Sequence, residues 1–359
     1  MLKQRRKNNM AGATPKLIKE LREMTGAGML DCKNALNETD GNLEKAVQAL
    51  RESGLGKAAK KAGNVAAEGL VTVLVNEDFT KATIVEINSQ TDFVAKNDNF
   101  IKLTQDITAH VQVTGVSQSE DLKKTTINGQ VFEEYLNEKI ATIGENIVAR
   151  KMATLSTTTG VVNGYMHSNG RVGVILAATC DAAVKDKAAA LLKSLSMHAS
   201  AMKPTVISYL DLDPAFVESE NRAIKAEIEA DNDELVRLNK PLKNIPDFVS
   251  KSQLTQEAIA NAKAKFEAEL KEQGKPEKIW ANIIPGKIER YITDNTQLDG
   301  RFALLSQAYV MDDKKTVEEA IAEVDPSIKI VEYVRFELGE GIEKIEEDFA
   351  AEVAAQMAK

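Results

Sequence analysis

The chain has 359 residues, of which 43% are hydrophobic and 28% charged, a composition typical of globular proteins with two or three domains. Its formal net charge of −8 argues against direct binding to nucleic acid, which normally rests on a basic surface. No apolar run approaches the roughly 20 residues that cross a bilayer, and no apolar segment follows the basic N-terminus as in a secretory signal. Cys32 and Cys180 form no CxxC pair, so we expect two buried thiols in a reduced, cytoplasmic compartment.

Residues 14–54 have the pattern of a compact three-helix domain. Apolar residues at helical spacing indicate three short helices, separated by breaks at 25–28 and 40–41. The residues expected to face inward are Leu17, Ile18, Leu21, Met24, Cys32, Ala35, Leu36, Ala46, Val47 and Leu50. Asn42 is suited to cap the third helix and Gly54 to end it. The lysine-rich stretch 55–67 then fits a linker or a lone exposed helix.

A strand–strand–helix pattern occurs twice in the next part of the chain. The first copy has β-branched segments at 70–75 and 82–88 and a helix from about Asp98. The second has strands at 161–166 and 172–177, joined through Asn169-Gly170, which is a strong hairpin signal, and a helix at 182–200. His110 and His198 fall at equivalent places in the two helices. The pattern predicts an internal duplication.

The remaining segments complete the predicted domain organisation, an α+β multidomain fold with antiparallel sheets. A helix over 132–151 should connect core subdomain N (68–152) with core subdomain C (157–210 and 301–337). Residues 211–300 are highly charged, and two long exposed helices at 223–238 and 257–273 predict an inserted helical hairpin or coiled coil. Strands return at 308–311 and 328–336. A C-terminal module, 338–359, would carry an acidic helix whose apolar stripe contains Ile345, Phe349, Val353 and Met357.

A search for catalytic motifs indicates a protein that is not an enzyme and needs no cofactor or bound metal. The Gly56-Lys57 pair lacks the glycine and the hydroxyl residue of a phosphate-binding loop, because Arg51 and Ala58 occupy those positions. The three histidines, His110, His167 and His198, are isolated and lack metal-ligand spacing. We expect structural roles for His110 and His198.

Two apolar features admit both a structural and a functional interpretation. Phe93 lies in the polar segment SQTDFVAKND at 89–98, between a predicted strand and a helix that Asn97 or Asp98 could cap. It either folds back under this loop as a hydrophobic staple or projects as an aromatic wedge beside Asp92, a typical hot-spot pairing. The pair Met29-Leu30 either fills the core of the three-helix domain or forms an adaptable binding surface.

The chain resembles the elongation factor Ts family along nearly its whole length, from 17 to 359, apart from the insertion. The matching segments are LIKELR (17–22), TGAGMLDCK (25–33), KAAKKAGNVAAEG (57–69), SQTDFVAKND (89–98), IGEN (143–146) and RFELGEGIEKIEEDFAAEVAAQ (335–356). The resemblance implies a ubiquitin-associated-like N-terminal domain, a core of two related subdomains, a helical coiled coil and a C-terminal module. It also implies guanine-nucleotide exchange on elongation factor Tu in the cytoplasm, without contact to nucleic acid or membrane.

The resemblance further implies roles for individual residues. Those that displace Mg²⁺ from elongation factor Tu would be Thr91, Asp92, Phe93 and Val94, with Asp92 and Phe93 as the working pair. Other residues would bind the same partner: Leu21, Met29, Leu30, His167, Ile345, Phe349 and Val353. Three features depart from the family pattern, namely Leu30 in place of a second methionine, Ser89 in place of a cysteine, and the length of the 211–300 insertion. Self-association or a 2:2 complex through the core or coiled coil stays open.

Two other functions compete with nucleotide exchange. Residues 14–54 alone would suit a ubiquitin-associated-type adaptor for a peptide or nascent chain, but this leaves the loop at 89–98 and the acidic C-terminal segment unexplained. An enzyme would need a reactive Cys32, and no neighbouring residue in the sequence would lower the pKa of this thiol.

Overall fold

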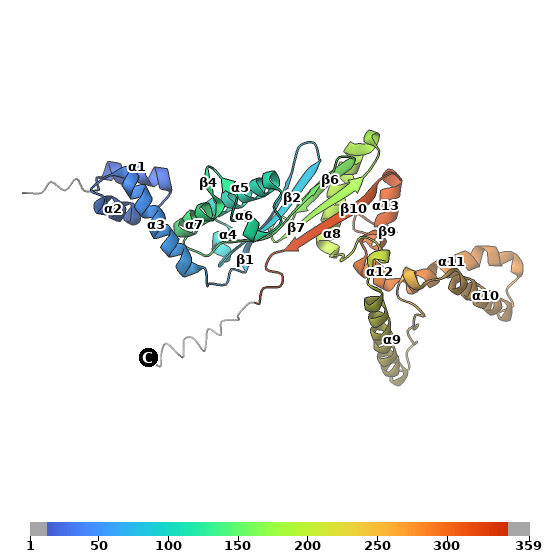
Figure 1. The fold of residues 1–359 in the computed structure, drawn as a ribbon. Coiled ribbons are helices and arrows are strands. Elements are labelled where there is room, and N and C mark those ends of the chain that lie inside the picture. Colours follow the sequence, from blue (N-terminus) through green and yellow to red (C-terminus); the bar gives the residue numbers. More distant parts are fainter. Residues whose placement is uncertain (1–12, 344–359) are drawn as a thin grey trace, which may run out of the picture.

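The structure, a computed structural model, describes residues 13–343. The molecule is elongated, with three helices at one end, two β-sheets in the middle, and a group of helices projecting from the other end (Figure 1). Strands pair only in an antiparallel manner within the two main sheets. This arrangement confirms the predicted α+β class.

The N-terminal helices are α1 (Pro15–Thr25), α2 (Met29–Glu38) and α3 (Leu43–Lys61). Their small core contains Leu21, Cys32, Leu36 and Ala46, all without solvent exposure, and Asn42 caps α3 by accepting a hydrogen bond from the Lys45 amide. The prediction that Met24 faces this core was wrong. Its side chain is 62% exposed and borders a groove between the three helices and the core.

The third helix does not end at Gly54 as predicted, but continues seven residues further, to Lys61. The reason is a close contact with helix α7 (Phe132–Ile143). A Cβ atom on Gly54 would lie 3.4 Å from the Cβ of Ala141, so glycine serves here as a site of close helix approach rather than a stop. Residues 55–61 are therefore helical, and only the short segment after Lys61 connects α3 to the first strand.

Two three-stranded sheets form the centre of the molecule. Strands β1 (Glu68–Val75), β2 (Lys81–Ser89) and β5 (Val148–Ser156) form one sheet in the order β1-β2-β5. Strands β6 (Gly160–Met166), β7 (Val172–Thr179) and β10 (Lys329–Glu337) form the other, in the order β10-β7-β6. In each sheet a hairpin is followed by a helix, α5 (Asp98–Thr114) or α8 (Lys185–Met202), and a third strand then pairs with the second. The two halves thus share one topology.

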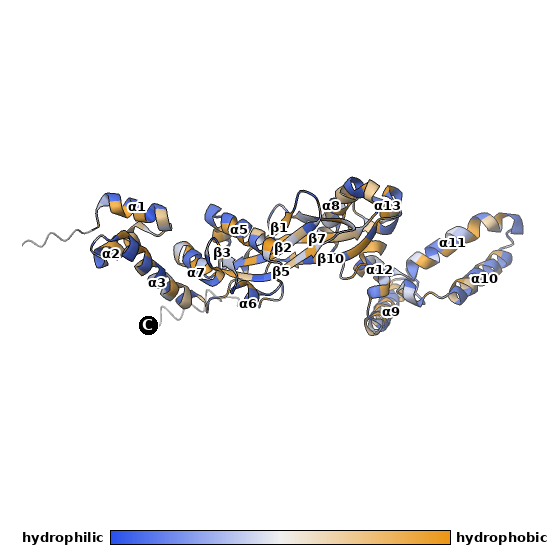
Figure 2. Ribbon diagram, turned by 45° about the horizontal axis from the view of Figure 1, so that its top comes forward, coloured by the Kyte–Doolittle hydropathy of each residue, from blue (hydrophilic) through white to orange (hydrophobic). Residues whose placement is uncertain are grey.

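Each sheet carries buried side chains on both faces, although strand β10 at the edge of the second sheet is only partly covered. One face packs against its own helix: Phe100 and Ile107 of α5 lie in the core of the first unit, and Leu192 and Leu195 of α8 in that of the second. The other faces meet in a third apolar cluster, formed by Val71, Ala82, Ile84, Leu155, Val162, Ile175, Ala177 and Leu338. Figure 2 shows the hydrophobic colouring of these strands. Small elements complete the first unit: α6 (Ser119–Leu122), β3 (Thr126–Ile127) and β4 (Gln130–Val131).

The connection predicted as a helix over 132–151 contains a helix and a strand. Helix α7 stops at Ile143 because Gly144 adopts a left-handed conformation (φ 88°), which glycine tolerates without steric cost. The chain then enters β5, whose residues from Val148 on pair with β2. The strand character of this segment depends on that pairing, which a local helical pattern does not reveal.

The helices between 211 and 300 are α9 (Pro214–Arg237), α10 (Gln256–Glu272), α11 (Trp280–Asp294) and α12 (Gln297–Phe302). We expected a hairpin of 223–238 with 257–273, but the helix that packs along α10 is α11, through Phe266 with Tyr291 and Glu269 with Lys287. The extended segment after α9 returns along α9 itself, where the Lys243 amide donates to Asn232. Strands β8 (Ala308–Tyr309) and β9 (Asp312–Thr316) and helix α13 (Val317–Val324) follow. The predicted helix at 343–357 lies, apart from its first residue, outside the described residues.

Candidate functional site

The loop after β2 projects an aromatic side chain into solvent. Thr91 caps the single-turn helix α4 (Asp92–Ala95), and Asn97 caps α5 directly afterwards. Phe93, in the first turn of α4, is 80% exposed. The staple interpretation was therefore wrong, and the ring is exposed as the alternative requires, while its role as a wedge stays a prediction. A large exposed aromatic residue on a loop is a candidate binding hot spot.

The other residues of this turn divide into an exposed and an anchored group. Asp92 is exposed and accepts a hydrogen bond from Lys96 Nζ at 2.7 Å, and this bond lowers the pKa of the Asp92 carboxyl, which stays ionised at neutral pH. Val94, by contrast, packs against the core of the first sheet, and Thr91 is half-buried. The turn thus presents an aromatic ring next to a carboxylate, while Thr91 and Val94 attach it to the rest of the protein.

Glu145 fastens the loop from a distant part of the sequence. Its Oε2 accepts hydrogen bonds from the backbone amides of Gln90 at 3.1 Å and Thr91 at 3.0 Å. Its Oε1 accepts one from the Thr91 hydroxyl at 2.6 Å. Sequence reasoning gave Glu145 no role. The one signal was the presence of IGEN among the segments that carry the family resemblance.

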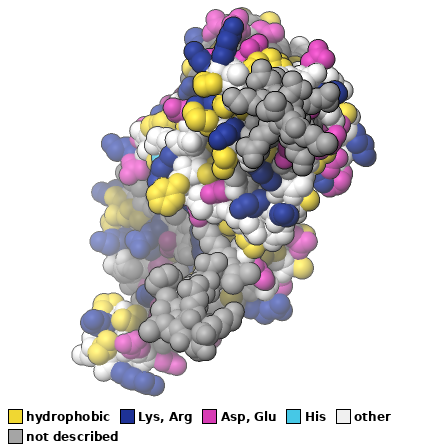
Figure 3. Space-filling model, turned by 90° about the vertical axis from the view of Figure 1, so that its left-hand side faces the viewer, with side chains coloured by type: hydrophobic (Ala, Val, Ile, Leu, Met, Phe, Trp, Pro, Cys, Tyr) yellow, Lys and Arg dark blue, Asp and Glu magenta, His cyan; other side chains and the backbone are white. Residues whose placement is uncertain are grey.

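The exposed start of α2 forms a second candidate surface. Met29 and Leu30 are 63% and 68% exposed, so they do not fill the core of the three-helix domain. Leu21, which the resemblance grouped with them, is fully buried in that core and is not available for direct contact. Seen from this end, the molecule shows hydrophobic side chains among lysines, arginines and carboxylates, without a surface of one charge (Figure 3).

The three histidines occupy different environments. His198 is fully buried, and His110 is partly buried and stacked on Phe132. Both side chains therefore pack within the protein, as expected for structural residues. His167 is exposed in the turn between β6 and β7, where its Nδ1 lies 3.0 Å from the Tyr165 hydroxyl. Residues 168–171 of this turn and Asp92 of the Phe93 loop both line a groove of about 1060 Å³.

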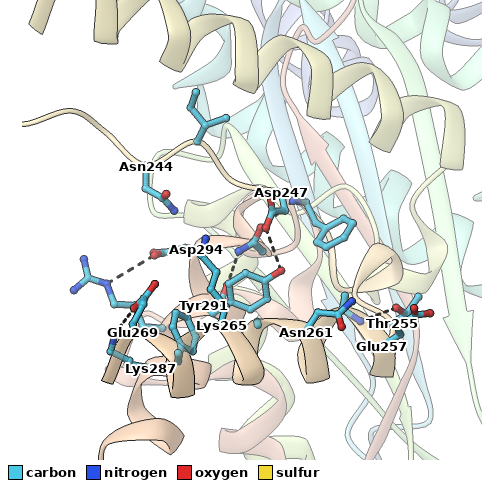
Figure 4. A pocket seen from close by; sticks show the side chains of 17 residues that line it. Asn244, Asp247, Thr255, Glu257, Asn261, Lys265, Glu269, Lys287, Tyr291 and Asp294 are labelled. Atoms are coloured by element: carbon cyan, nitrogen blue, oxygen red, sulfur yellow. Dashed lines mark hydrogen bonds and ion pairs between the residues drawn. The ribbon is translucent and has the colours of Figure 1, made fainter. Parts of the chain in front are cut away.

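Another cavity, of about 980 Å³, lies among α10, α11 and the segment 244–248 (Figure 4). Its charged side chains are of both signs and largely paired. Lys287 Nζ lies 2.8 Å from Glu269, and the Tyr291 hydroxyl donates to Asp247 at 3.4 Å. This lining indicates no preference for a ligand of one charge.

Within residues 13–343, no group of three or more acidic, histidine or cysteine side chains is arranged to hold a metal ion. None of the helices in that range is both long and apolar enough to cross a membrane. Cys32 is buried and Cys180 only partly so, which corrects the expectation that both thiols are buried. Burial raises the pKa of both thiols, the opposite of activation. Ile345, Phe349 and Val353 lie outside the described residues, so their role stays a prediction.

The architecture and the exposed loop define an α+β multidomain protein that presents a wedge-like turn beside its first sheet. The family model for "Elongation factor TS" matches residues 90–245 and 242–340. The chain belongs to the elongation factor Ts family of translation elongation factors.

Curated relatives with this name are similar over nearly their full length. Elongation factor Ts of Aliarcobacter butzleri (strain RM4018) is 76% identical over 350 residues, which cover 98% of this chain and 100% of the relative. That of Campylobacter curvus (strain 525.92) is 59% identical, with 96% and 99% covered. That of Helicobacter hepaticus (strain ATCC 51449 / 3B1) is 53% identical, with 97% and 100% covered.

Proposed function

We propose that this chain is a guanine-nucleotide exchange factor that binds elongation factor Tu in its GDP form and promotes GDP release. The observation that carries this proposal is the 80% exposure of Phe93 on a turn anchored by Thr91 and Glu145. An apolar ring held in water by a fixed turn has no stabilising role in its own fold, but it suits insertion into a partner. The chain itself performs no bond-breaking chemistry.

The proposed mechanism acts on the metal ion of the partner. In GTPases of this type the nucleotide is held by a phosphate-binding loop and by Mg²⁺ on the phosphate oxygens. Phe93 would enter between helices of elongation factor Tu and shift the segments that position the ion, with the ionised Asp92 beside it. Loss of Mg²⁺ leaves the phosphate charges uncompensated, and GDP then dissociates faster.

Three further surfaces would supply affinity rather than exchange. Met29 and Leu30 offer exposed apolar area at the start of α2, and methionine suits such adaptable contacts. His167 would contact another part of the same partner, and the stripe of Ile345, Phe349 and Val353 would add a further contact. Thermodynamic linkage completes the cycle. If the chain binds nucleotide-free elongation factor Tu more tightly than the GDP form, GDP must bind more weakly in its presence.

The test is the release of fluorescently labelled GDP from elongation factor Tu, with excess unlabelled nucleotide, in the presence and absence of the purified chain. Acceleration by substoichiometric chain is expected, because an exchange factor is released when nucleotide rebinds. A ubiquitin-associated-type adaptor would leave the release rate unchanged, and that result would refute the proposed function.

A further inference from the structure

Thr91 connects Glu145 to the turn that carries Phe93 through two hydrogen bonds of its side-chain hydroxyl. Its hydroxyl donates to Glu145 at 2.6 Å and accepts from the Val94 amide at 3.4 Å, as the N-cap of α4. One oxygen atom therefore connects the carboxylate to the helical turn. Hydrogen bonds to a carboxylate are roughly twice as strong as neutral ones, so this contact ties the first turn of α4, which carries Phe93, to Glu145.

The loop and the segment 145–146 each donate a backbone hydrogen bond to a side chain of the other. While Glu145 accepts from the Gln90 amide, the Asn146 amide donates to the Gln90 side chain at 2.9 Å. Asn146 is 7% exposed, and its Nδ2 donates to the carbonyl of Asn64 at 2.8 Å. The loop is therefore tied to the segment 145–146, which is in turn tied to the chain just after α3.

Helix α7 connects this anchor to the N-terminal helices. Its C-terminal end leads through Gly144 directly to Glu145, and its side packs along α3. There Arg51 Nε lies 3.1 Å from Glu138, and Gly54 permits the close approach described above. The same helix thus supports the domain that exposes Met29 and Leu30 and holds the loop that exposes Phe93.

We propose that Glu145 is a positioning residue for nucleotide exchange: it holds Thr91 so that Phe93 projects in the direction that enters the partner. This inference rests on the proposed function and adds to it a residue that lies outside the loop. Removing Glu145 should lower the maximal exchange rate more than the affinity, because Met29 and Leu30 keep their contacts. Small displacements of an interacting group suffice for large rate effects.

The experiment measures labelled GDP release from elongation factor Tu over a range of concentrations of the full-length chain. It yields a maximal rate and a half-saturating concentration for each variant. Glu145→Ala should lower the maximal rate about tenfold and change the half-saturating concentration by less than about twofold. Glu145→Gln keeps an oxygen for the two backbone amides but loses the charge, so its maximal rate should lie between wild type and Glu145→Ala.

A double-variant comparison separates positioning from an independent effect. If Glu145 acts only through Phe93, then Phe93→Ala combined with Glu145→Ala should be no slower than Phe93→Ala alone. If the rate losses of the two single variants instead multiply in the double variant, so that it is slower than Phe93→Ala alone, the inference is overturned. Glu134→Gln, the same charge change at an exposed site of α7, is the matched control and should behave as wild type.

The outcomes distinguish the two proposals. If Phe93→Ala slows exchange and Glu145→Ala does not, the positioning role is refuted and the proposed function stands. If Phe93→Ala itself has no effect, the proposed wedge function fails. Circular dichroism verifies folding. Should Glu145→Ala unfold, Glu145→Gln decides the question, because a wild-type maximal rate in that variant also refutes the positioning role.

Discussion

One guanidinium nitrogen of Arg150 donates to both carboxylate oxygens of Glu86, at 3.1 Å each, within the central sheet. Glu86 is fully buried in β2. Its Oε1 also accepts from Asn88 Nδ2 at 3.0 Å and from the Gly339 amide at 2.9 Å. The pair therefore balances a buried charge and also ties the end of the described chain to the first sheet.

Arg150→Met should destabilise the core strongly, because it leaves the Glu86 carboxylate buried without its cation. Losing one partner of a buried ion pair costs about 3 kcal/mol or more, which urea denaturation would detect as a lower midpoint. Arg290→Met is the matched control, since Arg290 is 85% exposed and forms, within residues 13–343, a single ion pair, with Asp294 at 3.8 Å. Its cost should be below about 1 kcal/mol. Equal effects of the two variants would contradict the assigned role of Arg150.

Phe93→Ala should slow GDP release from elongation factor Tu at least about tenfold, in line with the cost of roughly 2 kcal/mol or more for hot-spot truncations. The melting temperature should not change, because the ring is 80% exposed. Val113→Ala serves as control, since Val113 is 84% exposed near the far end of α5. An unchanged exchange rate for Phe93→Ala would remove the wedge assignment.

Sequence patterns predicted those parts of the fold whose structure depends mainly on residues close together in the chain. The two hairpins followed from β-branched runs and from Asn169-Gly170, whose turn needs the positive φ found at Gly170. Asn42 was correctly predicted as a cap from its position before an apolar run. Predictions failed where contact with a segment distant in the sequence determines the local structure. Gly54 ends no helix because Ala141 packs against it, and 148–151 is a strand because β2 pairs with it.

The candidate site was predictable only in part for the same reason. The sequence located Phe93 but left open whether it is exposed, because the turn that carries it is held by Glu145, more than fifty residues further along the chain. Likewise, the resemblance grouped Leu21 with Met29 and Leu30 as a partner contact, whereas its helical spacing correctly indicated that it faces the core. Residue types and spacing identify the surface, whereas packing selects which side chains reach it.

His198 should make the stability of the second unit depend on pH. Burial lowers the pKa of its imidazole from the ordinary value of 6.5. Its Nε2 donates to Gln307 at 3.0 Å, and Nδ1 accepts from the Val310 amide at 3.2 Å, which only a neutral ring can do. Since the unfolded chain binds the proton more readily, the stabilisation is complete above pH 6.5 and is lost as pH falls toward the folded pKa.

The measurement compares urea denaturation at several pH values between about 5 and 8, the range that brackets an ordinary histidine pKa. His198→Gln should be less stable than wild type at the upper end and show a smaller loss on acidification. His167→Gln, at an exposed position, should retain the wild-type pH dependence. The same slope in wild type and His198→Gln would show that another group titrates.

The dependence of exchange on Mg²⁺ tests the proposed mechanism rather than the partner. If the loop acts by displacing the ion, then chelating Mg²⁺ from elongation factor Tu with GDP bound does in advance what Asp92 and Phe93 do. The relative defect of a combined Asp92→Ala, Phe93→Ala variant should therefore shrink markedly in excess chelator. Release should still be faster with either protein than without, because Met29, Leu30 and the core surfaces remain. A relative defect that is the same at millimolar Mg²⁺ and in chelator would mean that the loop acts on the nucleotide pocket by another route, even though the family assignment holds.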